Sequence, residues 1–127
     1  MRGNSESVVR RAGVAVLILC PFSIGARGTT SEEYFVKAVA MADAVANGCP
    51  LLEVNPEAQL FYMASVGLRP EDFAKGGRLF DAYLMALLDA TERVSKGVAP
   101  LICRFGEERF GEKGTLWPRL LRPKQSP

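Results

Sequence analysis

Residues 29–48 read TTSEEYFVKAVAMADAVANG, and this stretch carries the start, the periodicity and the end of one long helix. Thr30 stands at the N-cap with Glu33 three residues later, which is the spacing of a capping box. Gly48 follows the apolar run, where a helix commonly ends. Between these signals, apolar side chains recur at helical spacing and predict packing in a core rather than a cofactor site. They are Tyr34, Phe35, Ala38, Val39, Met41, Ala42, Val45 and Ala46.

Two shorter helices are indicated next. Asn55 is a good N-cap, and Pro56 suits the first helical position because its missing N–H costs nothing there. This helix should end at Gly67, which can adopt the left-handed conformation of a C-cap. Residues 68–77 repeat the proline-plus-acid start and should form one or two turns before a pair of glycines ends them.

Residues 78–97 form the most strongly amphipathic segment, and we expect this helix to be the spine of the core. Its broad apolar face consists of Leu79, Phe80, Tyr83, Leu84, Leu87 and Leu88. A last helix should begin near Pro100 and contain Cys103. No stretch shows the sustained alternation of a β-strand, and no long internal repeat occurs. The sequence therefore predicts an all-α bundle of about four principal helices over residues 29–121, followed by a flexible tail at 122–127.

The N-terminus has the three parts of a secretory signal. Arg10 and Arg11 precede an uncharged run at residues 12–26, and small residues follow it. We prefer cleavage after Gly28 to cleavage after Gly25, because the next residues open the long helix. Residues 1–28 are therefore expected to be a signal peptide, and the mature protein to be periplasmic or secreted.

Two other interpretations of this segment stay open. An uncleaved anchor would need about 20 apolar residues, but the run is shorter and contains Pro21. A lipoprotein signal would need a small residue before the acylated cysteine, but Leu19 precedes Cys20. We expect no stable membrane span after signal cleavage.

Without the leader, the chain is close to neutral. Four of the 16 basic residues and one of the 14 acidic residues lie in the leader, so residues 29–127 keep 12 basic against 13 acidic residues, a net charge of −1. Such a chain lacks the basic stripe that a nucleic-acid-binding protein needs. We expect no nucleic acid among its partners.

Two cysteines, Cys49 and Cys103, remain after cleavage. In an oxidising compartment, two cysteines in a small domain most often form a disulfide. A redox site would favour a Cys-x-x-Cys pair or a thiolate beside a basic group, and only the adjacent Arg104 offers such a group. We expect a structural disulfide that joins the end of the first helix to the last one.

The chain contains no histidine, which removes the commonest general base and the usual zinc and haem ligands. No phosphate-binding glycine loop occurs either. We therefore expect no cofactor, no metal and no catalytic residues. Paired carboxylates are the remaining candidates for acid–base chemistry, but their positions suit helix starts and a solvated helix face. These pairs are Glu32–Glu33, Glu71–Asp72 and Glu107–Glu108.

Trp117 lies with Leu120 and Leu121 in a segment that Pro118 and Pro123 keep from continuing as a helix. An exposed aromatic beside leucines and arginines would suit a partner-binding or membrane-surface patch. Alternatively, the segment folds back over the core. We favour the second interpretation, because a small bundle gains from any extra apolar burial.

Together these features predict an exported helical protein without catalytic activity that binds another macromolecule or a small apolar ligand, or has a structural role. An inhibitor or immunity protein of an envelope enzyme is the alternative among binding proteins. A small carboxylate-dependent enzyme is the alternative from a different class.

We predict that the exported protein begins near Thr29. The small residues Ala26 and Gly28 occupy the positions that signal cleavage requires, so N-terminal sequencing of the envelope or secreted fraction should find a chain that lacks residues 1–28. Retention of Arg2 in that fraction would contradict the prediction.

Overall fold

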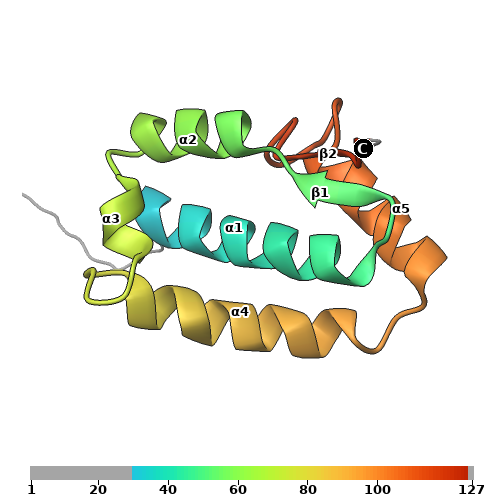
Figure 1. The fold of residues 1–127 in the computed structure, drawn as a ribbon, viewed down its shortest axis with the longest axis horizontal. Coiled ribbons are helices and arrows are strands. Elements are labelled where there is room, and N and C mark those ends of the chain that lie inside the picture. Colours follow the sequence, from blue (N-terminus) through green and yellow to red (C-terminus); the bar gives the residue numbers. More distant parts are fainter. Residues whose placement is uncertain (1–29, 126–127) are drawn as a thin grey trace, which may run out of the picture. The chain divides into compact units, whose positions relative to one another are not determined.

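The computed structural model describes residues 30–125, so the predicted leader lies outside the described residues. Within this range the chain forms five helices and two short strands, which confirms a helix-rich fold (Figure 1). The elements are α1 (Ser31–Gly48), β1 (Leu52–Val54), α2 (Pro56–Ser65), α3 (Pro70–Phe73), α4 (Phe80–Val94), α5 (Ala99–Phe110) and β2 (Leu121–Pro123).

Several predicted helix ends are confirmed. The Asn55 side chain accepts hydrogen bonds from the backbone N–H groups of Glu57 and Ala58, at 3.2 and 3.4 Å, and so caps α2. Gly67 and Gly76 have φ angles of 78° and 89°, in the left-handed region that favours glycine. Gly67 follows the C-cap of α2 as expected, but α3 ends earlier than predicted, at Phe73 with Ala74 as its C-cap, and Gly76 lies in the turn beyond it.

The central helix is α1, not the segment 78–97 that we expected to be the spine. In Figure 1, α1 lies between α2 on one side and α4 on the other. Its side chains are buried around most of the helix: Phe35, Val36, Ala38, Val39, Ala40, Ala42, Ala44 and Val45. On α4 only Ala90 is fully buried, while Met85 and Leu88 keep 68% and 67% of their surface exposed. The strongest amphipathic pattern thus belongs to a peripheral helix.

Small residues let α1 and α4 lie close together. The two helices run parallel, since Arg78 meets Glu32 near their starts and Val94 meets Gly48 near their ends. A Cβ atom on Gly48 would lie only 2.9 Å from Val94 Cγ1, so a larger residue would push the helix ends apart. Helix axes can approach more closely where side chains are small.

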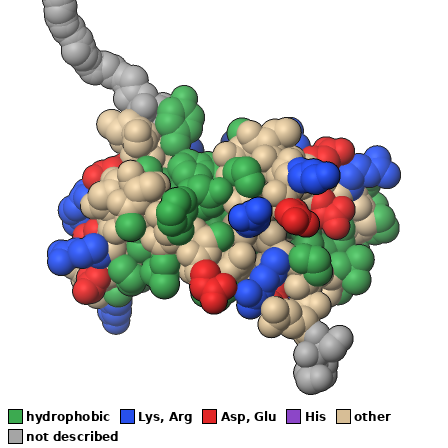
Figure 2. Space-filling model, turned by 90° about the horizontal axis from the view of Figure 1, so that it is seen from above, with side chains coloured by type: hydrophobic (Ala, Val, Ile, Leu, Met, Phe, Trp, Pro, Cys, Tyr) green, Lys and Arg blue, Asp and Glu red, His purple; other side chains and the backbone are tan. Residues whose placement is uncertain are grey.

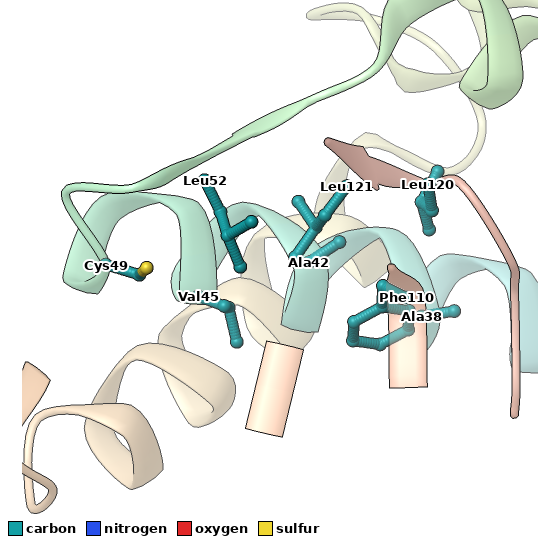
Figure 3. Packing of buried hydrophobic residues seen from close by; sticks show 8 residues of the cluster. All are labelled: Ala38, Ala42, Val45, Cys49, Leu52, Phe110, Leu120 and Leu121. Atoms are coloured by element: carbon teal, nitrogen blue, oxygen red, sulfur yellow. The ribbon is translucent and has the colours of Figure 1, made fainter. Parts of the chain in front are cut away.

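The last helix packs on α1 through a glycine. A Cβ atom on Gly106 would lie 2.6 Å from Val45 Cγ1 and 3.0 Å from Leu52 Cδ1, so only glycine fits at this position without movement. Figure 3 shows the buried cluster around this contact, which draws on α1, α5 and both strands. Its buried members are Ala38, Ala42, Val45, Cys49, Leu52, Phe110, Leu120 and Leu121.

The two strands correct the all-α prediction. β1 and β2 pair antiparallel, with Leu52 opposite Pro123 and Val54 opposite Leu121. The Lys124 N–H extends the pairing by donating to the Leu51 carbonyl at 2.9 Å. Strands of three residues are too short to show the period-two pattern that marks a strand in a sequence. Because Arg122 and Pro123 lie in β2, the secondary structure continues past the expected start of the tail at residue 122.

The segment before β2 covers the core. Leu120 and Leu121 are 0% and 1% exposed, so they do not form the surface patch that was one interpretation of this segment. The Trp117 ring packs edge-on against Phe35 and Tyr62, with ring centroids 5.4 and 4.9 Å apart. The Tyr62 hydroxyl also donates to the carbonyl of residue 118 at 2.7 Å.

Cys49 and Cys103 lie at disulfide distance, with Cα atoms 5.2 Å apart. Cys49 follows α1 directly and is fully buried, while Cys103 lies inside α5. A bond between them would therefore hold α5 to the end of α1.

We predict that this disulfide forms and that it is structural. The sequence separation of 54 residues closes a long loop in the unfolded chain, so replacing both cysteines by alanine should cost about 2–5 kcal/mol of unfolding free energy while the helical spectrum persists. Denaturant unfolding followed by circular dichroism measures this loss. Two free thiols in the exported protein, found by mass spectrometry, would contradict the prediction.

Candidate functional site

One flank of the α1–α4 pair is open. It forms a pocket of about 550 Å³ whose lining comes from α1, α4 and the turn before α4. Most of the lining is apolar, and charged side chains stand at its edges. The apolar residues are Val36, Met41, Leu79, Ala82, Met85, Ala86 and Ala90, and the charged ones are Glu32, Glu33, Lys37, Asp89 and Arg93.

The pocket exists because α4 offers little bulk on this flank. Ala82, Ala86 and Ala90 follow one another at one-turn intervals, so they share one face of the helix. None has a side chain beyond Cβ. Ala82 is exposed and Ala86 is partly exposed to the open space, while Ala90 is buried. Met41 and Met85 border this space with flexible side chains that adapt to ligands of different shape.

A second hollow of about 380 Å³ adjoins the first, since Met41 and Arg93 line both. Its other walls come from the end of α4 and from α5, where Leu101 and Phe105 contribute. We call the two hollows together the α1–α4 groove. It follows α4 from Leu79 to Val94.

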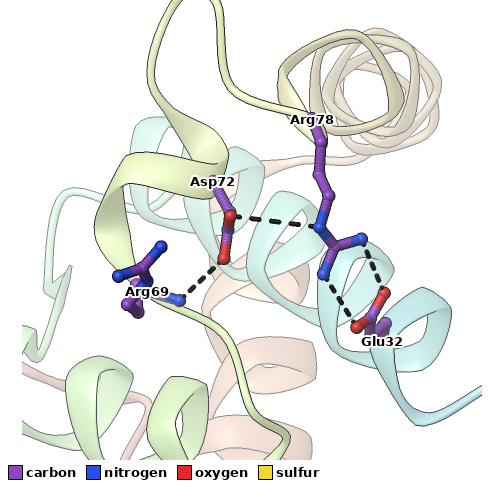
Figure 4. Close-up of polar contacts among 4 residues, drawn as sticks. All are labelled: Glu32, Arg69, Asp72 and Arg78. Atoms are coloured by element: carbon purple, nitrogen blue, oxygen red, sulfur yellow. Dashed lines mark hydrogen bonds and ion pairs between the residues drawn. The ribbon is translucent and has the colours of Figure 1, made fainter.

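Ion pairs fix the charged groups at the edges of the groove. Arg78 donates to both carboxylate oxygens of Glu32, at 3.1 and 2.9 Å, and also lies 4.0 Å from Asp72 (Figure 4). The guanidinium hydrogen bond lowers the pKa of Glu32. Arg93 pairs with Asp89 at 3.1 Å one turn away on α4. Both pairs are exposed, so each contributes little to stability.

The carboxylates considered for acid–base chemistry have structural partners or lie at the surface. Glu32 and Asp72 meet at Arg78, and Asp72 also accepts a hydrogen bond from the Arg69 N–H at 3.0 Å. Glu107 and Glu108 lie exposed on α5. Among residues 30–125, no group of three His, Cys, Asp or Glu side chains is placed to hold a metal ion. No helix in this range is long and apolar enough to cross a membrane.

Asp43 and Tyr83 form a partly buried hydrogen bond between α1 and α4, with the tyrosine hydroxyl as donor. Burial raises the pKa of Asp43, and the hydrogen bond from Tyr83 only partly offsets this. Burial also raises the pKa of Tyr83, and the hydrogen bond to Asp43 adds to the increase. Neither residue lines the groove, so the pair holds the two helices together rather than facing a ligand.

A smaller apolar surface lies on α2. Leu60 and Phe61 point outward there, and Figure 2 shows hydrophobic side chains exposed on the face that includes α2. No residue of α2 lines either hollow of the groove. We therefore regard the groove as the stronger candidate site.

Sequence patterns did not indicate a site on the open flank: Glu32 and Glu33 were considered only as paired carboxylates at a helix start, and Met41 and Leu79 only as core residues. The available signal was the alanine at every fourth position of α4, 82, 86 and 90, which leaves a shallow face on an otherwise bulky helix. The chain matches no protein-family model, no curated protein and no solved structure. The fold and the groove define the chain as a small helical domain with an apolar cleft.

We predict that Tyr83→Phe costs about 1.5 kcal/mol at neutral pH, because Asp43 loses its donor. The tyrosine pKa is raised above its ordinary value of 10.0, so its contribution to stability is present below pH 10 and is lost as the pH rises through the raised pKa. The stability difference between wild type and variant should therefore shrink above pH 10. Chemical denaturation at several pH values measures it, and a constant difference would contradict this account.

Proposed function

We propose that the protein is an exported binding protein without catalytic activity, and that the α1–α4 groove is its binding site. The observation that carries this proposal is the open apolar lining on a pair of helices that are otherwise firmly packed. A cleft of several hundred Å³ with mostly apolar walls and a few charged groups at its edges is typical of ligand-binding sites.

The surroundings of the groove support a binding role. Its floor belongs to α1, the most buried helix, so the site would be held rigidly. Among its ionisable groups, Glu32 pairs with Arg78 and Asp89 pairs with Arg93, and none of the charged lining residues is fully buried. Such an arrangement suits the burial of an apolar surface better than acid–base chemistry.

Export is supported by the cysteine pair. Cys49 and Cys103 lie at disulfide distance, and disulfides persist in oxidising compartments such as the periplasm or the extracellular space. The same pair joins α5, which forms one wall of the groove, to the end of α1. The same disulfide thus supports the proposed compartment and holds one wall of the proposed site in place.

We predict that the exported protein binds the uncharged apolar dye Nile red at one saturable site. Ala82→Leu fills the groove and should weaken dye binding about tenfold or more, because the larger side chain occupies the space that the dye needs. Thr91→Leu adds an exposed leucine to α4 outside the groove and serves as the matched control. Fluorescence titration measures both variants.

Equal loss of binding in the two variants, or no saturable binding by the wild type, would contradict the proposed site. Dye contacts that map to Phe61 on α2 by nuclear magnetic resonance would do the same. Both substitutions place leucine, a good helix former, at an exposed position, so each variant should retain its fold.

A further inference from the structure

The two cysteines differ in how far the fold encloses them. Cys49 is 0% exposed and belongs to the buried cluster of Figure 3, which also contains Val45 and Leu52. Its backbone is held as well, because its N–H donates to the Val45 carbonyl at 2.8 Å and its carbonyl accepts from the Leu52 N–H at 3.4 Å. A reagent in solution therefore has no direct approach to Cys49 in the folded chain.

Cys103 lies at the less enclosed end of α5. No residue of α5 before Gly106 is fully buried, and the neighbouring Leu101 and Arg104 are exposed. Cys103 itself is partly exposed. Its position puts it on the same face of the helix as Gly106 and Phe110, which are buried, so it lies at the margin of the contact between α5 and α1.

The position of α5 does not depend on the disulfide alone. Gly106 packs so closely on α1 that a Cβ atom there would lie 2.6 Å from Val45 Cγ1, and Phe110 is only 1% exposed. Both contacts lie beyond Cys103, toward the C-terminal end of the helix. We therefore expect α5 to stay on α1 in the reduced chain, with Cys49 still covered and Cys103 at the margin.

From this difference in enclosure we infer that Cys103 is the residue at which the chain exchanges thiols and disulfides with other molecules, and that Cys49 reacts only with Cys103. The partner is a disulfide donor, the class of oxidant that forms protein disulfides in an oxidising compartment. The inference rests on the predicted disulfide and concerns how that bond is made, so it is independent of the α1–α4 groove.

The disulfide forms in two exchange steps. In the reduced chain, the Cys103 thiolate attacks one sulfur of the donor, the S–S bond of the donor breaks, and the other sulfur leaves as a thiolate. The Cys49 thiolate then attacks Cys103 Sγ and expels the donor sulfur that was bound there. The protein loses two protons and two electrons, and the donor disulfide becomes two thiols. The second step is intramolecular, and Cα atoms 5.2 Å apart keep the two cysteines within reach of each other.

The same packing disfavours the reverse order. If Cys49 met the donor first, the donor would have to enter the buried cluster and remain there as a mixed disulfide. Around Gly106 this cluster has no room even for an added Cβ atom, which would lie 3.0 Å from Leu52 Cδ1 as well as close to Val45. An attack by Cys103 requires no such opening of the core.

The test compares two single substitutions, each the matched control for the other. Cys49→Ala leaves Cys103 as the thiol to be measured, and Cys103→Ala leaves Cys49. Each variant of the exported protein is mixed with glutathione disulfide, and mass spectrometry follows the mixed disulfide. The folded Cys49→Ala variant should react at least about tenfold faster, because Cys49 can react only when the fold opens locally. In denaturing guanidinium chloride the two rates should become similar, since the enclosure is gone.

A second measurement uses the unsubstituted chain and so avoids any effect of the substitutions on folding. The reduced exported protein receives a short pulse of iodoacetamide, and peptide mapping gives the alkylated fraction at each cysteine. Cys103 should be alkylated first, while circular dichroism shows that the helices persist. Equal rates at the two cysteines of the folded protein, or faster reaction of Cys49, would overturn the inference.

Discussion

The packing of α1 against its neighbours through residues with little or no side chain is the constraint on which the rest of the structure depends. Gly48 lets the end of α4 approach, and Gly106 lets α5 cross at Val45. The alanines at 38, 40, 42 and 44 are all buried on α1 itself. Each contact brings larger apolar groups nearby into van der Waals range, and those groups provide most of the stabilisation.

Placing α1 at the centre leaves α4 at the edge, and the groove follows from this. α4 has apolar side chains on more of its circumference than α1 can cover, so Leu84, Met85 and Leu88 stay partly or largely exposed. On the flank toward Met41, the alanines of α4 leave open space instead of bulk. The stability of the domain and the presence of an open groove therefore come from the same distribution of small and large residues over two helices.

Sequence patterns predicted local features well and relative positions poorly. The cap at Asn55, the end of α2 at Gly67, and the cysteines at disulfide distance depend on local chemistry or on a simple count. The prediction that residues 78–97 form the spine of the core was wrong, because periodicity measures how well apolar side chains are confined to one face of a helix. A central helix such as α1 is buried on several faces and has a weaker pattern.

Neither the strands nor the groove was predicted from the sequence, for a related reason. Glu53 and Arg122 pair across 69 residues of sequence, and neither strand is long enough to show its own period. The groove is defined by side chains that are absent at positions 82, 86 and 90, facing residues of another helix. Its existence depends on how α1 and α4 pack, which the sequence of either helix alone does not encode.

Native-state hydrogen exchange tests the central position of α1 most directly. If α1 is the enclosed helix, its amides between Phe35 and Val45 should exchange only through global unfolding and be the slowest in the protein. The amides of α4 should exchange faster, through partial opening of an edge helix that borders the groove. Amides of α4 as slow as or slower than those of α1 would contradict the account and restore α4 as the spine.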